Sequence, residues 1–290
     1  MSSQFGGNSV YLPLKRVIVR KPTKDFSDAN PTEWNYTSHP DLSEALSEHN
    51  FIVNLLEKYG AEVIYHDENL PGKADSIYVF DPIYMTDFGA IILKPGKQLR
   101  SGEETALKKL ISKLDIPIIL ELSGSAKAEG GDMLWVDENT LAIGVGFRTN
   151  TEAVKQIKEV LEPRGIEVKY FDLPYFEGPK SCLHLLSTVS IVDKDIAVIY
   201  PRLMPVGFYQ LLVDKGFKFA IVPDNEFLTM GPNVLAIAPK LCLMIQGNPE
   251  TQTALENLGC TVHTYKGDEI SLKSEGGPTC LTRPILRSTS

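Results

Sequence analysis

Short apolar runs alternate along this chain with longer segments that carry apolar residues on one side. Runs bounded by turn residues predict buried strands, and apolar positions three and four residues apart predict amphipathic helices. The predicted strands are residues 16–19, 61–65, 76–80, 90–93, 116–120, 133–136, 141–145, 166–171, 189–192, 196–200, 217–222, 234–238, 241–245 and 260–265. The predicted helices are residues 41–59, 101–114, 151–161, 207–214 and 250–258.

Polar residues mark several boundaries of these elements. Asp41 is predicted to cap the first helix, and the sequence from Ser101 to Glu104 has the pattern of a capping box. Residues 1–10 are polar and are expected to form a loose terminus. Residues 21–40 contain three prolines and several aromatic residues. A loop of that length in a compact domain is typical of a lid.

The elements repeat along the chain. The order strand, strand, helix, strand occurs four times, and a fifth copy lacks its first strand at the N-terminus. Ile285 and Leu286 could supply that strand and close a ring. We therefore predict an α/β fold, a five-bladed α/β propeller of ββαβ repeats around a pseudo-fivefold axis, with residues 1–290 as one domain. An open doubly wound sheet is the alternative, but the hairpins argue against it.

Composition narrows the class of protein. The 290 residues carry a formal net charge of -8 with no long basic run, so we expect no nucleic-acid partner. No apolar run reaches the roughly 18 residues of a membrane span, and no signal peptide is evident. The four cysteines are scattered, which argues against disulfides and zinc pairs. These features predict a soluble cytoplasmic protein with free thiols, in which Cys182, Cys242 and Cys260 are packing residues.

Unusual polar residues recur at one point of the repeat. Each precedes or flanks a strand that begins or closes a unit, and equivalent positions in a ring converge at one end of its axis. They are Asp75, Asp81, Glu129, His184 and Cys280. Cys280 comes two residues after Gly276-Gly277-Pro278, a turn that could hold a thiol at the mouth of a pocket.

Each of these residues also has a structural interpretation. Asp75 and Asp81 could be turn residues, and Cys280 could be a small buried hydrophobe. His184 lies two residues after Cys182, as metal ligands often do, but no second pair has suitable spacing. The shared position in the repeat favours a functional site, because independent accidents would not all fall at the same point. The remaining histidines are interpreted as structural or surface residues.

Five short motifs match a known family in order and spacing. The chain resembles the guanidine-modifying pentein enzymes over nearly its whole length, and most closely their dimethylarginine dimethylaminohydrolase branch. The motifs are Asp75-Ser76-Ile77-Tyr78-Val79-Phe80-Asp81, Glu129-Gly130-Gly131-Asp132, Arg148-Thr149-Asn150, His184-Leu185-Leu186-Ser187-Thr188 and Gly276-Gly277-Pro278-Thr279-Cys280.

The resemblance implies a chemistry for these residues. Cys280 would attack the guanidinium carbon to form a covalent thiouronium intermediate, and His184 would act as general acid and then base. Glu129 and Asp81 would hold the planar cation, assisted by Asp75. Arg100 and Arg148 would hold a substrate carboxylate, and Asp132 would be structural. The resemblance implies a small guanidino substrate, no metal or organic cofactor, and, by family habit, a homodimer.

Two departures from the family pattern bear on specificity. Arginine deiminases and amidinotransferases of this kind carry an acid two residues after the histidine, where this chain has Leu186. An alkylated guanidinium has fewer N–H donors, so the loss suits such a substrate. Phe80 stands where relatives often have a charged residue. Deimination of arginine or another guanidine, amidino transfer, and a non-catalytic propeller like a ribosome anti-association factor remain alternatives.

Overall fold

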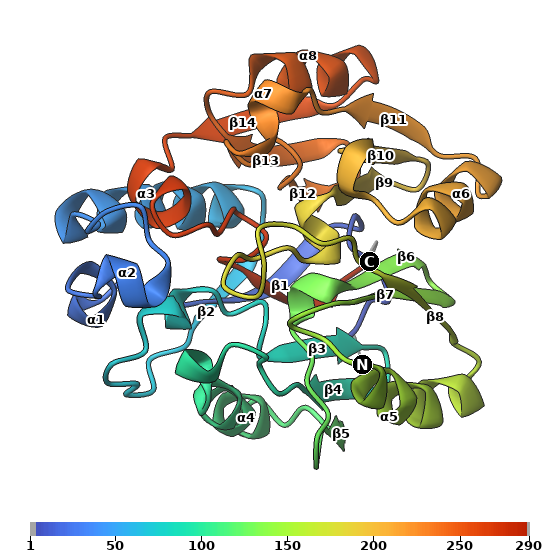
Figure 1. The fold of residues 1–290 in the computed structure, drawn as a ribbon, viewed down its shortest axis with the longest axis horizontal. Coiled ribbons are helices and arrows are strands. Elements are labelled where there is room, and N and C mark those ends of the chain that lie inside the picture. Colours follow the sequence, from blue (N-terminus) through green and yellow to red (C-terminus); the bar gives the residue numbers. More distant parts are fainter. Residues whose placement is uncertain (1–3, 289–290) are drawn as a thin grey trace.

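Five small β-sheets surround the middle of the molecule, and the longer helices lie outside them (Figure 1). The structure is a computed structural model and describes residues 4–288. The sheets consist of β15 (Arg283–Arg287), β1 (Leu14–Val19) and β2 (Glu62–Tyr65); β3 (Ile83–Thr86), β4 (Gly89–Ile92) and β5 (Ile118–Glu121); β6 (Met133–Asp137), β7 (Thr140–Val145) and β8 (Glu167–Asp172); β9 (Val189–Asp193), β10 (Ile196–Ile199) and β11 (Lys218–Ile221); and β12 (Leu235–Ala238), β13 (Leu241–Ile245) and β14 (Thr261–Tyr265).

One connection pattern builds all five sheets. The first strand pairs antiparallel with the second, and the second pairs parallel with the third after a helix. This confirms the predicted repeat. The helices are α1 (Lys24–Ser27), α2 (Pro31–Trp34), α3 (Leu42–Lys58), α4 (Glu103–Lys113), α5 (Thr151–Leu161), α6 (Val206–Asp214), α7 (Asp224–Phe227) and α8 (Pro249–Asn257). None of these helices combines the length and apolar content that a membrane span requires.

The C-terminal strand completes the first sheet. β15 pairs antiparallel with β1, with Val17 opposite Pro284 and Ile18 opposite Arg283. The predicted closing strand is thus confirmed. Of the terminus expected to be loose, residues 1–3 lie outside the described residues. Residues that follow are held in place, since the Gly6 amide donates to the Ile285 carbonyl. The expectation was therefore wrong for this part of the terminus.

The predicted strand at 76–80 is not a strand. Ala74–Ile77 forms a 3₁₀ turn, and the first strand of this sheet is β3, which the sequence analysis did not predict. The backbone between them is bound by groups from elsewhere. The Arg100 guanidinium donates to the Tyr78 carbonyl, and the Phe80 amide donates to the Cys280 carbonyl. These bonds replace ladder partners, so an apolar run is buried without forming a strand.

Two other local predictions also differ from the structure. The helix predicted from Ser101 begins at Glu103, and its N-cap is Gly102, which has a positive φ of 101° and no side chain to cap with. Residues 21–40, predicted as a loop, contain α1 and α2. The cap at Asp41 is confirmed, because its carboxylate accepts from the Glu44 amide at 2.9 Å.

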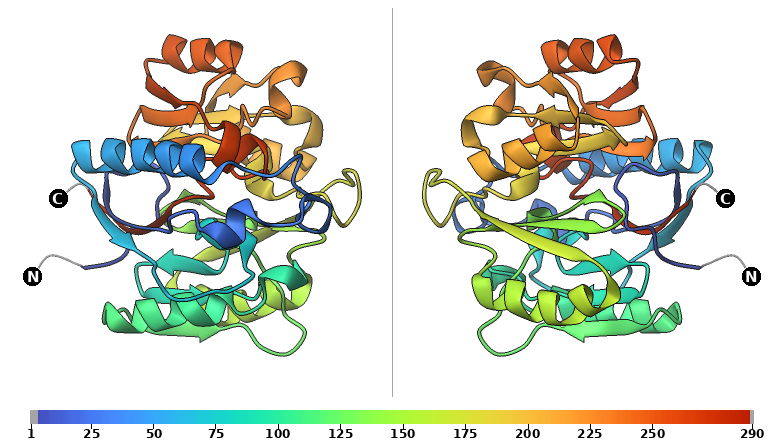
Figure 2. Two further views of the ribbon diagram at one scale, coloured as in Figure 1. Left: turned by 90° about the vertical axis from the view of Figure 1, so that its left-hand side faces the viewer. Right: turned by 90° about the vertical axis from the view of Figure 1, so that its right-hand side faces the viewer.

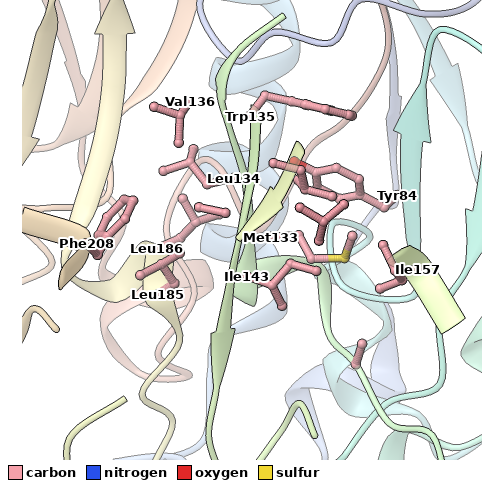
Figure 3. Packing of buried hydrophobic residues seen from close by; sticks show 14 of the residues in the cluster. Tyr84, Met133, Leu134, Trp135, Val136, Ile143, Ile157, Leu185, Leu186 and Phe208 are labelled. Atoms are coloured by element: carbon pink, nitrogen blue, oxygen red, sulfur yellow. The ribbon is translucent and has the colours of Figure 1, made fainter. Parts of the chain in front are cut away.

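β6 is buried on both faces and anchors part of the site. Met133 and Trp135 lie on the side of Tyr84, whereas Leu134 and Val136 lie on the opposite side, as strand alternation requires (Figure 3). The largest of the four buried clusters encloses these residues. The start of β6 is therefore fixed by packing, and the turn that precedes it carries Glu129 and Asp132.

Candidate active site

A fully buried carboxylate, Glu129, lies at the centre of a charged cluster. It directly precedes the turn into β6 and accepts from His184 Nε2 at 2.7 Å and from Arg148 Nη1 at 3.1 Å. The backbone amide of Lys97 donates to its other oxygen at 3.1 Å. Burial raises the pKa of Glu129, but the His184 hydrogen bond and the Arg148 charge outweigh it, so the net pKa is lowered. Glu129 is therefore ionised at neutral pH.

Asp132 supports the same turn from within the core. Its carboxylate accepts from the Thr149 hydroxyl at 2.6 Å and from the Leu185 amide at 3.0 Å. Burial raises the pKa of Asp132 to about 6, against the opposing charge of His184 and these hydrogen bonds. The Leu185 bond holds the backbone next to His184, which suits the structural role predicted for Asp132.

Asp81 and Arg100 form a second buried pair. Asp81 accepts from the Gly131 amide at 2.9 Å and from Arg100 Nη1 at 2.5 Å. Arg100 is 3% exposed and also donates to Glu103 through Nε and Nη2, at 3.0 and 2.7 Å. Most of the Arg100 donors are thus taken up by the protein's own acceptors. This geometry suits Arg100 to positioning Asp81 more than to gripping a substrate carboxylate.

Asp75 links the 21–40 segment to the site. It accepts from the Tyr36 hydroxyl at 2.8 Å and from Lys97 Nζ at 2.6 Å. The same ammonium group donates to the Trp34 carbonyl and lies 4.9 Å from the centre of the Trp34 ring. The segment predicted as a lid thereby packs over the acidic residues through its aromatic side chains.

His184 is held between Glu129 and a neighbouring thiol. Its Nε2 lies on Glu129, and its Nδ1 lies 3.4 Å from Cys182 Sγ. Burial lowers the pKa of His184, but Cys182, Asp132 and the hydrogen bond to Glu129 outweigh it and raise the pKa well above its usual value. The imidazole is therefore protonated at neutral pH and can deliver a proton to a leaving group.

Cys280 is half-buried beside these groups. The Asn233 side-chain amide donates to its Sγ at 3.5 Å. Burial and the charge of Asp81 raise the pKa of the thiol to about 11, although His184 and Asn233 act in the opposite direction. The resting group is therefore a thiol, and a cation bound near Asp81 would favour its ionisation.

We expect the alkylation rate of Cys280 by neutral iodoacetamide to rise roughly tenfold per pH unit above pH 7, because only the thiolate reacts. The rise should continue to near pH 11 without a plateau at neutral pH. The measurement is mass-spectrometric labelling of Cys280, with the Cys280→Ser variant used to subtract labelling elsewhere. A plateau between pH 7 and 8 would contradict a burial-raised pKa.

The cavity around Cys280 has two parts that meet at the same residues. We call the first, of about 50 Å³, the charged lobe; it is lined by Asp75, Asp81, Lys97, Arg100, Arg148 and Lys180. The second, of about 130 Å³, is the apolar lobe, lined by Phe80, Phe176, Leu186, Phe227, Leu228 and Met230. Cys182, His184, Glu275 and Cys280 line both lobes. The structure thus brings all the predicted site residues to one place, with Glu129 directly behind His184.

Sequence comparison agrees with this arrangement. The family model for arginine deiminase matches residues 78–215 and 208–287, which is more than half of the chain. The chain belongs to this family. It is a member of the pentein superfamily, as the resemblance implied.

Two relatives align with this chain over most of both lengths. An uncharacterised Bacillus subtilis protein, YkgA, is 27% identical over 96% of the chain and 93% of its own length. The dimethylarginine dimethylaminohydrolase of Pseudomonas aeruginosa is 24% identical over 93% of the chain and 98% of its own length.

Solved structures share the fold. The citrulline complex of a Pseudomonas aeruginosa dimethylarginine dimethylaminohydrolase mutant has a TM-score of 0.77 at 22% identity, covering 93% of this chain and 98% of that one. The N-terminal domain of the cyanobacterial arginine dihydrolase ArgZ has a TM-score of 0.81 at 17% identity, covering 94% and 97%. The mixed α/β fold with small sheets is therefore that of the family.

Two site residues were not found from the sequence. Cys182 was predicted to be a packing residue, but it is half-buried, contacts His184 and lines both lobes, so that prediction was wrong. Lys97 was not singled out, although it pairs with Asp75. Its place in the run Lys94-Pro95-Gly96-Lys97 is an ordinary loop signal. For Cys182, the sequence signal that indicated a site role was its position two residues before His184.

Among residues 4–288, Asp81, Glu129 and His184 bring potential metal-ligand atoms within 4.8 Å of one another. A metal ion needs the lone pair of a neutral imidazole. Here the raised pKa keeps His184 protonated, and Nε2 donates to Glu129. Arg100 and Arg148 already occupy the two carboxylates. The cluster is therefore better suited to hydrogen-bonding an organic cation than to coordinating a metal.

Proposed function

We propose that the protein hydrolyses the guanidino C–N bond of Nω-methylated arginine to give citrulline and methylamine or dimethylamine. The observation that carries this proposal is the half-buried Cys280 beside a protonated His184 and the ionised Glu129, with Asp81 in the same cavity. Guanidino-modifying relatives support the reaction class.

The first half of the reaction forms a covalent intermediate. Asp81, which lines the charged lobe, accepts N–H donors of the guanidinium and orients its carbon toward Cys280, while the negative charge of Glu129 behind His184 attracts the cation. The bound cation lowers the pKa of the thiol, whose proton leaves to solvent, and the thiolate then attacks that carbon. His184 gives a proton to the departing nitrogen as the C–N bond breaks. The products of this step are the free amine and an S-alkylthiouronium on Cys280.

The second half releases the product. His184, now neutral, removes a proton from water, and the hydroxide attacks the thiouronium carbon. The C–S bond breaks, so the ureido product leaves and Cys280 regains its thiol. Glu129 stays hydrogen-bonded to His184 and favours its return to the protonated form.

The remaining charged residues suit the amino-acid end of the substrate. Arg148 is 8% exposed, contacts Glu129 and lines the charged lobe, from which it would hold the α-carboxylate. Asp75 also lines the charged lobe and would contact the substrate there. Arg100 would act on the substrate indirectly, by positioning the Asp81 carboxylate. No metal or organic cofactor takes part.

The fold around this site is proposed to be a single-domain five-bladed α/β propeller. Five sheets of one connection pattern, with β15 completing the first, support that description. We propose that the protein is cytoplasmic and forms a homodimer, as the family resemblance implies. Size-exclusion chromatography with light scattering tests the dimer.

Leu186 favours the methylated substrate over arginine. It lies two residues after His184 and lines the apolar lobe. Arginine deiminases share 25% identity over part of the chain, so deimination is the second candidate function. Amidino transfer is a further candidate, since a solved amidinotransferase structure shares the fold with a TM-score of 0.78.

Citrulline formation from a substrate panel tests the proposal. The panel contains arginine, monomethylarginine, asymmetric dimethylarginine, agmatine and guanidino acids. We expect citrulline from the methylated arginines, with kcat/KM at least about tenfold above that for arginine, because each arginine N–H left without an acceptor in the site is costly. Turnover of arginine at a higher rate would identify a deiminase instead.

A further inference from the structure

The apolar lobe is larger than a methylated guanidine requires. We propose that it binds a hydrocarbon substituent on the departing guanidino nitrogen, so that the preferred substrates carry an Nω-substituent larger than methyl. This inference rests on the proposed function, because it concerns the same cavity and the same reaction.

The position of the lobe relative to His184 supports this assignment. The nitrogen that leaves must face His184, which protonates it. The charged lobe holds Asp75, Lys97 and Arg148, and these groups suit a zwitterionic amino-acid end. The apolar lobe is the other space that shares His184 and Cys280. A substituent on the leaving nitrogen therefore extends into the apolar lobe while the amino-acid end fills the charged one.

The walls of the apolar lobe are aromatic and packed. Phe176 meets Phe227 edge to face, with ring centroids 5.7 Å apart at 89°. Phe227 in turn stacks on Tyr200 with centroids 4.2 Å apart. Phe176 belongs to the projecting loop that follows β8, seen in yellow-green to yellow at the edge of Figure 2. These contacts preform one wall of the lobe.

The apolar side chains of the lobe suit an uncharged substituent. Leu186 and Phe80 are both buried, at 8% and 5% exposure. Two carboxylates, Glu177 and Glu275, also line the lobe; both residues are exposed, and Glu275 accepts from the Asn35 side-chain amide at 3.2 Å. An apolar group placed against Leu186 and Phe80 is removed from water there.

The volume of the lobe sets the size of the group. An apolar cavity of about 150 Å³ holds a benzene molecule. The lobe, at about 130 Å³, is close to that size. It therefore fits a hydrocarbon substituent of roughly three to six carbons, whereas a methyl group would leave most of it unfilled.

Comparison of Nω-propyl-L-arginine with Nω-methyl-L-arginine tests the inference. Each buried methylene is worth about fourfold in binding, so we expect kcat/KM to be roughly fifteenfold higher for the propyl compound. Citrulline and the released amine are both measured. Equal or lower kcat/KM for the propyl compound overturns the inference and leaves the proposed function standing. Absence of citrulline from both compounds, and from the other guanidines, overturns the proposed function as well.

A substitution at the lobe provides the second test. Leu228 is 75% exposed and lines the lobe, so Leu228→Asp should fold and place a charge beside the substituent. The propyl-to-methyl ratio of kcat/KM should fall by roughly fourfold, because the apolar Leu228 surface that the longer substituent would contact is lost. Val206→Asp, at an 84% exposed apolar residue outside both lobes, is the matched control and should keep the ratio. An unchanged ratio in Leu228→Asp contradicts the assignment.

Discussion

Replacement of Cys280 by serine should lower citrulline formation by at least about 10⁴-fold, because the group that forms the covalent bond is lost. A serine hydroxyl needs a base to become a nucleophile. The neighbouring imidazole, His184, is protonated because its pKa is raised well above the usual value, so it cannot serve as that base. Initial rates with Nω-methyl-L-arginine at saturating concentration measure the effect.

The fold of the Cys280→Ser variant should be unchanged, since serine is close in size and the thiol is half-buried. Circular dichroism and the melting temperature check this, and calorimetric titration should still detect substrate binding. Cys260→Ser, in an apolar cluster away from the site, is the matched control and should retain turnover. Activity within tenfold of the wild type in Cys280→Ser would mean that another group is the nucleophile.

Local patterns in the sequence were sufficient to predict the repeat. α5 has the predicted bounds because Ala153, Val154, Ile157 and Leu161 fall on one face and are buried. The closing strand was predicted by counting, since one unit lacked a strand and an apolar pair remained at the end of the chain. In both cases the burial that determines the element is visible in a short window of sequence.

The run at residues 76–80 shows where such windows fail. Its apolar residues are buried as predicted, yet whether the backbone pairs with a strand depends on distant groups. Arg100 and Cys280 supply those groups, from 22 and 200 residues further along the chain than the backbone atoms they bind, Tyr78 O and Phe80 N. No property of the run itself distinguishes the two outcomes.

The candidate site residues were predicted from their shared position in the repeat. The contacts that support them were not predicted. Equivalent positions converge because the units share one connection pattern, which is why Glu129, His184 and Cys280 lie close together. Lys97 and Cys182 come from irregular loops, whose course depends on tertiary packing. The burial of Arg100 against two carboxylates could likewise be seen only once the helix after it was in place.

Glu129→Gln should be the second severe variant. An amide cannot neutralise Arg148 and His184, so two buried cations lose their partner and the substrate cation meets a more positive cavity. Removal of one member of a buried charge pair costs about 3–5 kcal/mol. We expect kcat/KM for Nω-methyl-L-arginine to fall by roughly 30-fold to several thousand-fold, because truncating one partner of a buried charge pair at a binding site costs about 2–5 kcal/mol. Steady-state kinetics measure it, with the exposed Glu138→Gln as the charge-matched control.

The pH dependence of the same variant separates an electrostatic role from a purely structural one. The bond to Glu129 helps to raise the pKa of His184, so its loss should lower that pKa and move the alkaline limb of the pH–rate profile to lower pH. Because the folded-state pKa of Glu129 is depressed, its stabilising effect is present above the ordinary glutamate pKa and is lost as the pH falls below it. The difference in melting temperature between wild type and Glu129→Gln should therefore be larger at pH 7 than at pH 4. An unshifted rate profile together with unchanged substrate binding would remove Glu129 from the catalytic cluster.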